Sequence, residues 1–246
     1  MSGILFMVPT PVGNLSDMTP RAAEVLKSCS LVLTEDTRTS GVLMKHFGIS
    51  TPLMSHHKFN EHSTLEPIIA RLEAGENIAL VSDAGTPGIS DPGFLLSREC
   101  RRHGIKVETL PGPTAFVPAL VDSGLPCDRF FFEGFLPPKK GRSTRLSEIA
   151  ARSVTSIIYE SPLRLVKTLR QLAEVCGAER EASVSREISK IHETTERGTL
   201  GELIELFELN NPKGEIVIVL SGVSNDQQKP KHKNKYKQIK DDGDED

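Results

Sequence analysis

Carboxylate, imidazole and guanidinium side chains gather in two short stretches of this chain. Glu35, Asp36 and Arg38 follow one apolar run, and His56 and His57 follow the next. Carboxylates and imidazoles can remove a proton from a hydroxyl group. A guanidinium can bind a phosphate through two parallel hydrogen bonds. The two stretches therefore indicate general acid–base chemistry, with Arg38 as the phosphate ligand.

The same side chains also have structural interpretations. Asp36 can cap a helix that begins near Thr39, and His56 and His57 can be ordinary surface histidines. Glu160 is a further carboxylate candidate, but it stands beside a Ser-Pro pair and can be no more than a turn residue. The sequence alone leaves the identity of a general base open.

Three loops rich in glycine and proline each follow a predicted strand. They are residues 9–14 (PTPVGN), 82–93 (SDAGTPGISDPG) and 110–115 (LPGPTA). Glycine lets a backbone approach a ligand closely, and proline holds the shape of a loop. Ligands of open α/β sheets bind beyond the carboxyl ends of the strands. The loops therefore predict one binding site in which backbone groups bind an adenine and a ribose.

Several common kinds of site are excluded because their motifs are missing. The chain has no GxxxxGK[ST] loop and no GxGxxG after the first predicted strand. Its four cysteines are widely spaced, which argues against a zinc site and a disulfide framework. No apolar run approaches the roughly 18 residues of a membrane span, and residues 1–9 resemble a strand more than a signal peptide. We therefore expect a cytoplasmic protein without a metal or a membrane segment.

Short apolar runs alternate with helical patterns in the first half of the chain. Strands are predicted at residues 5–9, 31–34, 52–56, 78–82 and 106–110. The fourth of these is apolar on both faces, which is typical of a strand inside a parallel sheet. Thr19 and Pro20 begin one helix, Gly48 and Gly104 end two others, and Ser63 forms a capping box with Glu66. This alternation predicts an α/β fold.

A second α/β set follows residues 122–128 (DSGLPCD), which we take as a domain boundary. Strands are predicted at residues 129–132, 156–159, 182–186 and 215–220, with 192–197 as an additional option. Ser161 and Pro162 begin a helix that ends at Gly177, and Thr199 with Glu202 forms another capping box. The expected domains are residues 1–123 and 124–223, followed by a charged tail at 224–246.

Charge is unevenly placed in a chain whose formal net charge is −3. Residues 229–240 hold six lysines and residues 241–246 hold five acids. Such blocks are usually solvated and disordered, with weak nucleic-acid contact as the alternative. Residues 137–145 (PPKKGRSTR) are basic without any acid. They form either a flexible surface loop or a binding site for a nucleic-acid backbone.

The three loops, in their order, resemble the tetrapyrrole-methylase superfamily. More narrowly, several segments resemble the RsmI-type ribosomal RNA 2′-O-methyltransferases. These segments are residues 10–17 (TPVGNLSD), 35–39 (EDTRT), 82–93, 132–137 (FEGFLP), 159–162 (YESP), 186–187 (RE) and 213–215 (KGE). The likeness runs from about residue 5 to residue 222. It implies a tetrapyrrole-methylase-like α/β fold, with two domains and S-adenosylmethionine folded in the cleft between them.

Carried over by position, the resemblance implies cofactor contacts from both domains. The first domain would contribute Val12, Asp83, Gly85, Thr86, Ile89, Thr114 and Ala115. The second would contribute Tyr159, Arg186 and Gly214. The superfamily often has Gly-Asp-Pro in its second loop, where this chain has Gly-Thr-Pro at residues 85–87. Asp83 can supply the carboxylate that Thr86 lacks.

The resemblance also implies an activity. A homodimer would methylate the 2′-oxygen of a cytidine ribose in 16S rRNA of the small ribosomal subunit. The donor is already activated, so the protein mainly aligns the nucleophile and excludes water. Candidate catalytic residues are Asp36, Arg38, His56 and Glu160, and candidate RNA-binding residues are Lys139, Lys140, Arg142 and Arg145. The alternatives are a tetrapyrrole C-methyltransferase of cobalamin or sirohaem synthesis, and a binding module without catalysis.

Overall fold

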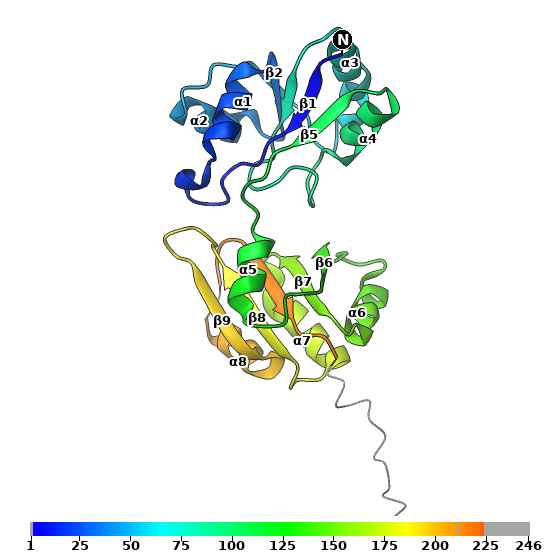
Figure 1. Ribbon diagram of the computed structural model, residues 1–246. Helices are drawn as coiled ribbons and strands as arrows, with labels where there is room; N and C mark the ends of the chain where they lie inside the picture. The colour runs from blue at the N-terminus through cyan, green and yellow to red at the C-terminus, as the bar shows by residue number, and fades with distance from the viewer. Residues whose placement is uncertain (1, 211, 224–246) are drawn as a thin grey trace, which may run out of the picture.

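The computed structural model describes residues 2–210 and 212–223 and shows two five-stranded sheets, one above the other in Figure 1. The first sheet has the order β3-β2-β4-β1-β5, and all its pairs are parallel. Its strands are β1 (Ile4–Met7), β2 (Leu31–Thr34), β3 (Leu53–Ser55), β4 (Ile78–Leu80) and β5 (Lys106–Thr109). The five strands predicted for this half are therefore confirmed, most of them with shorter ends.

Helices cover both faces of the first sheet (Figure 1). They are α1 (Pro20–Ser28), α2 (Thr37–His46), α3 (Glu61–Glu73) and α4 (Phe94–Arg102), with a short helix η1 (Leu15–Asp17) before α1. Leu31 and Leu33 pack with α3 and α4, whereas Val32 packs with α1 and α2. Alternate side chains of one strand thus enter opposite cores, which explains why these strands are apolar on both faces.

Local sequence patterns predicted most of the helix ends correctly. The Thr19 hydroxyl accepts a hydrogen bond from the Ala22 amide at 3.1 Å, and Gly48 and Gly104 have positive φ after their helices. The predicted capping box of Ser63 and Glu66 is wrong, because α3 begins two residues earlier, at Glu61. The preceding loop fixes that start: the side chain of Asn60, at the N-cap, accepts a hydrogen bond from the His57 amide and donates one to the Ser55 carbonyl.

The second sheet has the order β6-β7-β10-β8-β9 and is mostly antiparallel. Its strands are β6 (Phe130–Phe135), β7 (Thr155–Glu160), β8 (Glu181–Arg186), β9 (Thr194–Thr199) and β10 (Ile216–Leu220). The optional strand at residues 192–197 is therefore present, as β9. Gly177 ends a helix as predicted, and the capping box of Thr199 and Glu202 is confirmed.

One face of the second sheet packs against α6 (Arg142–Ala151), α7 (Leu165–Cys176) and α8 (Leu200–Leu209), with η2 (Pro162–Arg164) leading into α7. The other face packs against α5 (Phe116–Ser123), which contacts β8, β9 and β10. The domain limits 1–123 and 124–223 remain a prediction. The contacts of α5 favour a boundary on its N-terminal side. The charged tail at 224–246 lies outside the described residues.

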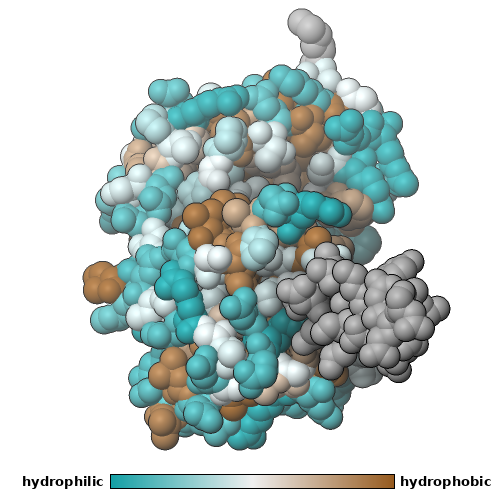
Figure 2. Space-filling view, turned by 60° about the horizontal axis from the view of Figure 1, so that its bottom comes forward, coloured by the Kyte–Doolittle hydropathy of each residue, from teal (hydrophilic) through white to brown (hydrophobic). Residues whose placement is uncertain are grey.

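None of the described helices is long and apolar enough to span a membrane. The face of the molecule seen in Figure 2 is largely hydrophilic, with a group of apolar side chains near its centre. All four cysteines are free thiols, and Cys29 and Cys100 are buried.

Candidate active site

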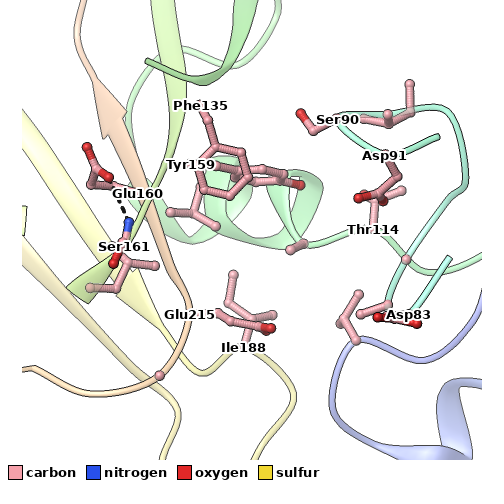
Figure 3. A pocket seen from close by; sticks show the side chains of 18 of the residues that line it. Asp83, Ser90, Asp91, Thr114, Phe135, Tyr159, Glu160, Ser161, Ile188 and Glu215 are labelled. Carbon is pink, nitrogen blue, oxygen red and sulfur yellow. Dashed lines mark hydrogen bonds between the residues drawn. The ribbon is translucent and has the colours of Figure 1, made fainter. Parts of the chain in front are cut away.

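A cavity of about 420 Å³ opens between the two sheets, beyond the carboxyl ends of the first sheet's strands. Figure 3 shows Asp83, Asp91 and Thr114 on one side, with Tyr159 and Glu160 across from them. The cavity is lined by these predicted cofactor residues: Val12, Asp83, Gly85, Thr86, Ile89, Thr114, Ala115, Tyr159 and Gly214. The fold thus brings all three loops together with the second sheet, and only Arg186 of that set lies outside the lining.

Hydrogen bonds join the three loops into one continuous wall of the cavity. Thr10 and Gly85 exchange two backbone hydrogen bonds, each 2.9 Å long, which connect the first loop to the second. The Thr86 hydroxyl donates to the Pro113 carbonyl at 3.0 Å and connects the second loop to the third. Gly85 has a φ of +83°, a conformation that side chains other than glycine rarely adopt. Sequence motifs far apart in the chain therefore form one continuous wall.

The second sheet supplies aromatic rings and a backbone loop to the opposite wall of the cavity. The Tyr159 ring packs edge-on against Phe132 and Phe135, with ring centroids 5.1 and 5.5 Å away. Burial, with added repulsion from Asp91 and Glu215, raises the pKa of Tyr159 to about 12, so its hydroxyl stays protonated. Arg186 reaches the cavity only indirectly, because its guanidinium donates to the Lys213 carbonyl at 3.4 Å, next to the lining residue Gly214.

The chemistry of the lining fits a nucleoside that carries hydroxyl groups and a positive charge. Val12, Ala115 and Val217 offer apolar contact. The Thr114 hydroxyl is buried and has no hydrogen-bond partner among the described residues, and such a group costs free energy unless a ligand or water pairs with it. Carboxylates in the same wall favour a cationic ligand.

Three acids gather in this wall: Glu35, Asp83 and Asp91. Burial, then repulsion from Glu35 and Asp83, raises the pKa of Asp91 to about 7, and the Ser82 hydroxyl opposes this only weakly. Burial and Asp83 also raise the pKa of Glu35, partly offset by His57. Burial is likewise the main cause that raises the pKa of Asp83. In the described chain, no lysine or arginine forms an ion pair with any of the three.

Among residues 2–210 and 212–223, no group of three or more His, Cys, Asp or Glu side chains is arranged to hold a metal ion. Asp91 was missed by the sequence reasoning, which singled out Asp83 in the same loop. The available signal was the second Asp-containing turn of that loop, at residues 90–93. Its significance depends on Glu35, which is distant in the sequence and close in the fold.

Asp36 and Arg38 lie outside the cavity lining. Asp36 is the N-cap of α2, and its carboxylate accepts a hydrogen bond from the Arg38 amide at 2.8 Å. Two hydrogen bonds from the Arg38 side chain, at 3.0 and 2.7 Å, are the main reason that the pKa of Asp36 falls to about 2. The helix-cap interpretation of Asp36 is confirmed. The Arg38 side chain is 90% exposed and remains accessible to a phosphate.

His56 is fully buried, so its interpretation as a surface histidine is wrong. Its Nδ1 lies 2.8 Å from the Thr64 hydroxyl, and its Nε2 has no partner among the described residues. Burial is the main cause that lowers its pKa, which keeps the ring neutral. His56 does not line the cavity, and its position beneath the β3–α3 loop suits packing rather than contact with a ligand.

Glu160 does line the cavity, but its carboxylate is fully engaged by the protein. It accepts hydrogen bonds from the Ser161 amide at 2.8 Å and the Thr168 hydroxyl at 2.6 Å. Arg164 lies 2.8 Å from one carboxylate oxygen and Arg142 lies 3.8 Å from the other. Glu160 therefore anchors the start of α7, a larger structural role than that of a turn residue.

The basic segment at residues 137–145 is not uniformly exposed. Arg142 is buried, and it donates to the Thr168 hydroxyl, the Gln171 side chain and the Pro137 carbonyl. The prediction that Arg142 binds RNA is therefore wrong, because the negative charge of Glu160 draws its guanidinium inward. Arg145 is half exposed and lies 2.9 Å from Glu148 and 3.5 Å from Glu133. Lys139 and Lys140 are exposed.

The family model of the tetrapyrrole (corrin/porphyrin) methylases matches residues 5–204. This chain belongs to that family. The methylase is 50% identical over 223 residues to "Ribosomal RNA small subunit methyltransferase I" of Synechocystis sp., which covers 90% of this chain and 80% of the relative. The protein of the same name from Escherichia coli O157:H7 is 48% identical, over 89% of this chain and 78% of the relative. That of Thermotoga maritima is 44% identical, over 89% and 99%.

Solved structures share the architecture of the methylase. A uroporphyrin-III C-methyltransferase from Thermus thermophilus superposes with a TM-score of 0.62 at 22% identity, over 88% of this chain and 94% of that one. A cobalt precorrin-4 methyltransferase gives 0.64 at 15% identity, over 89% and 94%. At these identities the likeness concerns the fold alone. The predicted fold class, two α/β domains of the tetrapyrrole-methylase type with a cleft between them, is confirmed.

Proposed function

We propose that this methylase transfers a methyl group from S-adenosylmethionine to the 2′-oxygen of a cytidine ribose in 16S rRNA of the small ribosomal subunit. The observation that carries this proposal is the cavity between the sheets, where three loops rich in glycine and proline meet a cluster of acids that pairs with no lysine or arginine of the described residues. The relatives named "Ribosomal RNA small subunit methyltransferase I", at 44–50% identity, support the choice of substrate.

The lining offers both apolar and polar contacts for the methyl donor. S-adenosylmethionine supplies an activated methyl group on a cationic sulfonium when it is bound. Val12, Ile89 and Ala115 would contact its adenine, and the partnerless Thr114 hydroxyl would gain a hydrogen bond. The carboxylate of Asp83 would accept hydrogen bonds from ribose hydroxyls and attract the positive charge.

Asp91 is the side chain best suited to act as general base. A ribose hydroxyl must lose its proton as its oxygen bonds to the methyl carbon, and a base is most effective when its pKa lies near the working pH. The pKa of Asp91, about 7, meets this condition. In Figure 3 the Tyr159 hydroxyl faces Asp91 across the cavity, where it can donate a hydrogen bond to a substrate oxygen. The proton would pass from the 2′-hydroxyl to the Asp91 carboxylate.

A homodimer in the cytoplasm is part of the proposal. Strand β6 stands at the edge of its sheet and exposes Phe130, Phe131 and Phe135, and the neighbouring α5 exposes Val117 and Val121. An exposed edge strand with aromatic side chains is an unfavourable surface for a monomer in water. A second copy of the chain would cover it, and sedimentation analysis tests this directly.

The substrate is tested by offering labelled S-adenosylmethionine with either small ribosomal subunits or uroporphyrinogen. We expect label only in 16S rRNA, on a 2′-O-methylcytidine that mass spectrometry locates. Subunits from cells that lack the protein should accept one methyl group, and subunits from normal cells should not. Transfer to uroporphyrinogen without transfer to subunits would overturn the proposal and favour a tetrapyrrole methyltransferase.

A further inference from the structure

An aromatic ring projects into solvent from the loop between β3 and α3. Phe59 is 90% exposed. A single exposed apolar residue is common on soluble proteins and by itself indicates nothing. What distinguishes Phe59 is how firmly its loop is held, which charges flank it, and where the loop stands.

The loop around Phe59 is fixed by short hydrogen bonds. The Asn60 side chain accepts from the His57 amide at 2.7 Å and donates to the Ser55 carbonyl at 3.0 Å. The Phe59 amide donates to Nδ1 of His57 at 3.2 Å, and the Glu61 amide donates to the His57 carbonyl at 2.9 Å. The ring is therefore presented outward from an ordered turn, which lowers the entropy that a contact with it would cost.

Cationic and aromatic neighbours flank the ring. Nζ of Lys58 lies 5.8 Å from the centroid of the Phe59 ring. The His57 ring meets it edge-on, with centroids 6.0 Å apart. Aromatic side chains beside basic groups bind unpaired nucleotides, since the ring stacks on a base and the cation binds the phosphate.

The position of the loop connects it to the cavity. Thr34 and Ser55 are paired in the parallel β2–β3 register, and the His56 amide donates to the Thr34 carbonyl at 2.8 Å. Glu35, directly after Thr34, lines the cavity. His57 is close enough to lower the pKa of Glu35. The loop that carries Phe59 therefore stands at the same sheet edge as the cavity.

We propose that Phe59 is a stacking platform for an unpaired RNA base next to the methylated nucleotide, with Lys58 binding the adjoining phosphate. This inference rests on the proposed function and adds to it a contact that selects single-stranded RNA beside the reacting ribose. Stacking of this kind accepts any base, so it positions an RNA strand without selecting its sequence. The platform adds substrate contact that the two exposed lysines of residues 137–145 do not supply.

The chain contains no tryptophan, so Phe59→Trp introduces a single indole at the platform. Its fluorescence should be quenched when a short single-stranded RNA or the small subunit is added, because a stacked base quenches indole. Leu209→Trp is the matched control: Leu209 is 85% exposed at the end of α8, on the outer side of the second sheet. Equal responses from the two variants would overturn the proposal.

Phe59→Ala provides the second readout. Its KM for small subunits should rise about tenfold, the size of effect expected from one lost base–aromatic stack, while its affinity for S-adenosylmethionine stays unchanged.

An unchanged KM, in an enzyme whose wild type methylates subunits, would overturn the platform and leave the proposed function standing. Failure of the wild type to methylate subunits would instead overturn the proposed function. A shift from dimer to monomer in Phe59→Ala would assign the ring to a contact between copies of the chain and overturn the platform.

Discussion

Glu160, which is buried, and Asp91, which is half-buried, lie on opposite sides of the cavity, and their surroundings differ. In the second domain, Glu160 lies within 4 Å of two arginines, Arg142 and Arg164, at 3.8 and 2.8 Å. Glu133 is likewise paired with Arg152, at 2.7 Å, and with a second arginine, at 3.5 Å. In the loops of the first sheet, the charged neighbours of Asp91 within the described part of the chain are two acids, Glu35 and Asp83.

This difference separates carboxylates that hold the fold from those that are available for chemistry. A buried charge is costly unless it is paired and hydrogen-bonded. Glu160 meets both conditions within the protein, so a ligand has nothing to add. Asp91 has acids instead of a cation beside it and only a weakly opposing hydrogen bond from Ser82, and its raised pKa records the cost. A cationic ligand or a transferred proton would relieve that cost, which is why the group around Asp91 is assigned to catalysis and the group around Glu160 to stability.

The largest expected effect comes from Asp91→Asn, which removes the general base and keeps the shape of the side chain. We expect the single-turnover rate of methyl transfer to fall by about 10²- to 10⁴-fold, with the unfolding midpoint in urea at neutral pH no lower than that of the wild type. A rate within twofold of that of the wild type would contradict the assignment of Asp91 as the general base.

Glu160→Ala should act on stability instead. It leaves Arg142 buried without its counter-charge, and breaking a buried pair in this way costs about 3–5 kcal/mol of unfolding free energy. Glu148→Ala is the control, because Glu148 also pairs with an arginine but is half exposed, and such a pair contributes about 0–1 kcal/mol. Urea unfolding of both variants measures the difference, and equal losses would contradict the structural assignment of Glu160.

A smaller effect concerns the pH dependence of stability. The pKa of Asp91 in the folded protein, about 7, lies above the 3.8 expected for an ordinary aspartate. Between those values the folded state holds a proton that the unfolded state releases, so this residue makes the protein less stable as pH rises from about 4 to 7. Asp91→Asn removes that dependence. Its melting temperature should therefore exceed that of the wild type by more at pH 8 than at pH 4.

The smallest effect is expected at the surface lysines. Since Arg142 is an internal counter-charge and Arg145 is paired with two acids, only Lys139 and Lys140 remain free to bind phosphates from that segment. Neutralising both lysines should reduce the salt dependence of RNA binding by at most about two units of slope, roughly one for each phosphate contact. Neutralising Arg145 as well should leave the slope where the double variant has it, and a drop near three units would show that Arg145 also contacts RNA.

Local patterns in the sequence predicted most of the fold and the loops of the site. Apolar runs gave the strands, and Thr19 and Gly177 gave helix ends, because neighbouring residues decide these features. The start of α3 was missed because Asn60, at the N-cap, makes no side-chain capping hydrogen bond and bonds instead to the loop before it. The burial of Arg142 and the environment of Asp91 were missed for a different reason. Each depends on a residue distant in the sequence, and charge counting along the chain does not record such pairs.

The most direct test is the pH dependence of single-turnover methyl transfer to small subunits, measured for the wild type, Glu35→Gln and Asp91→Asn. At subsaturating S-adenosylmethionine, where the rate reports the free enzyme, the rate of the wild type should rise with pH and level off above an inflection near pH 7, where Asp91 ionises. Removal of the neighbouring negative charge in Glu35→Gln should move that inflection to lower pH, and Asp91→Asn should lose it. An inflection that is unmoved in Glu35→Gln, or that persists in Asp91→Asn, would contradict the assignment of the acid cluster to catalysis.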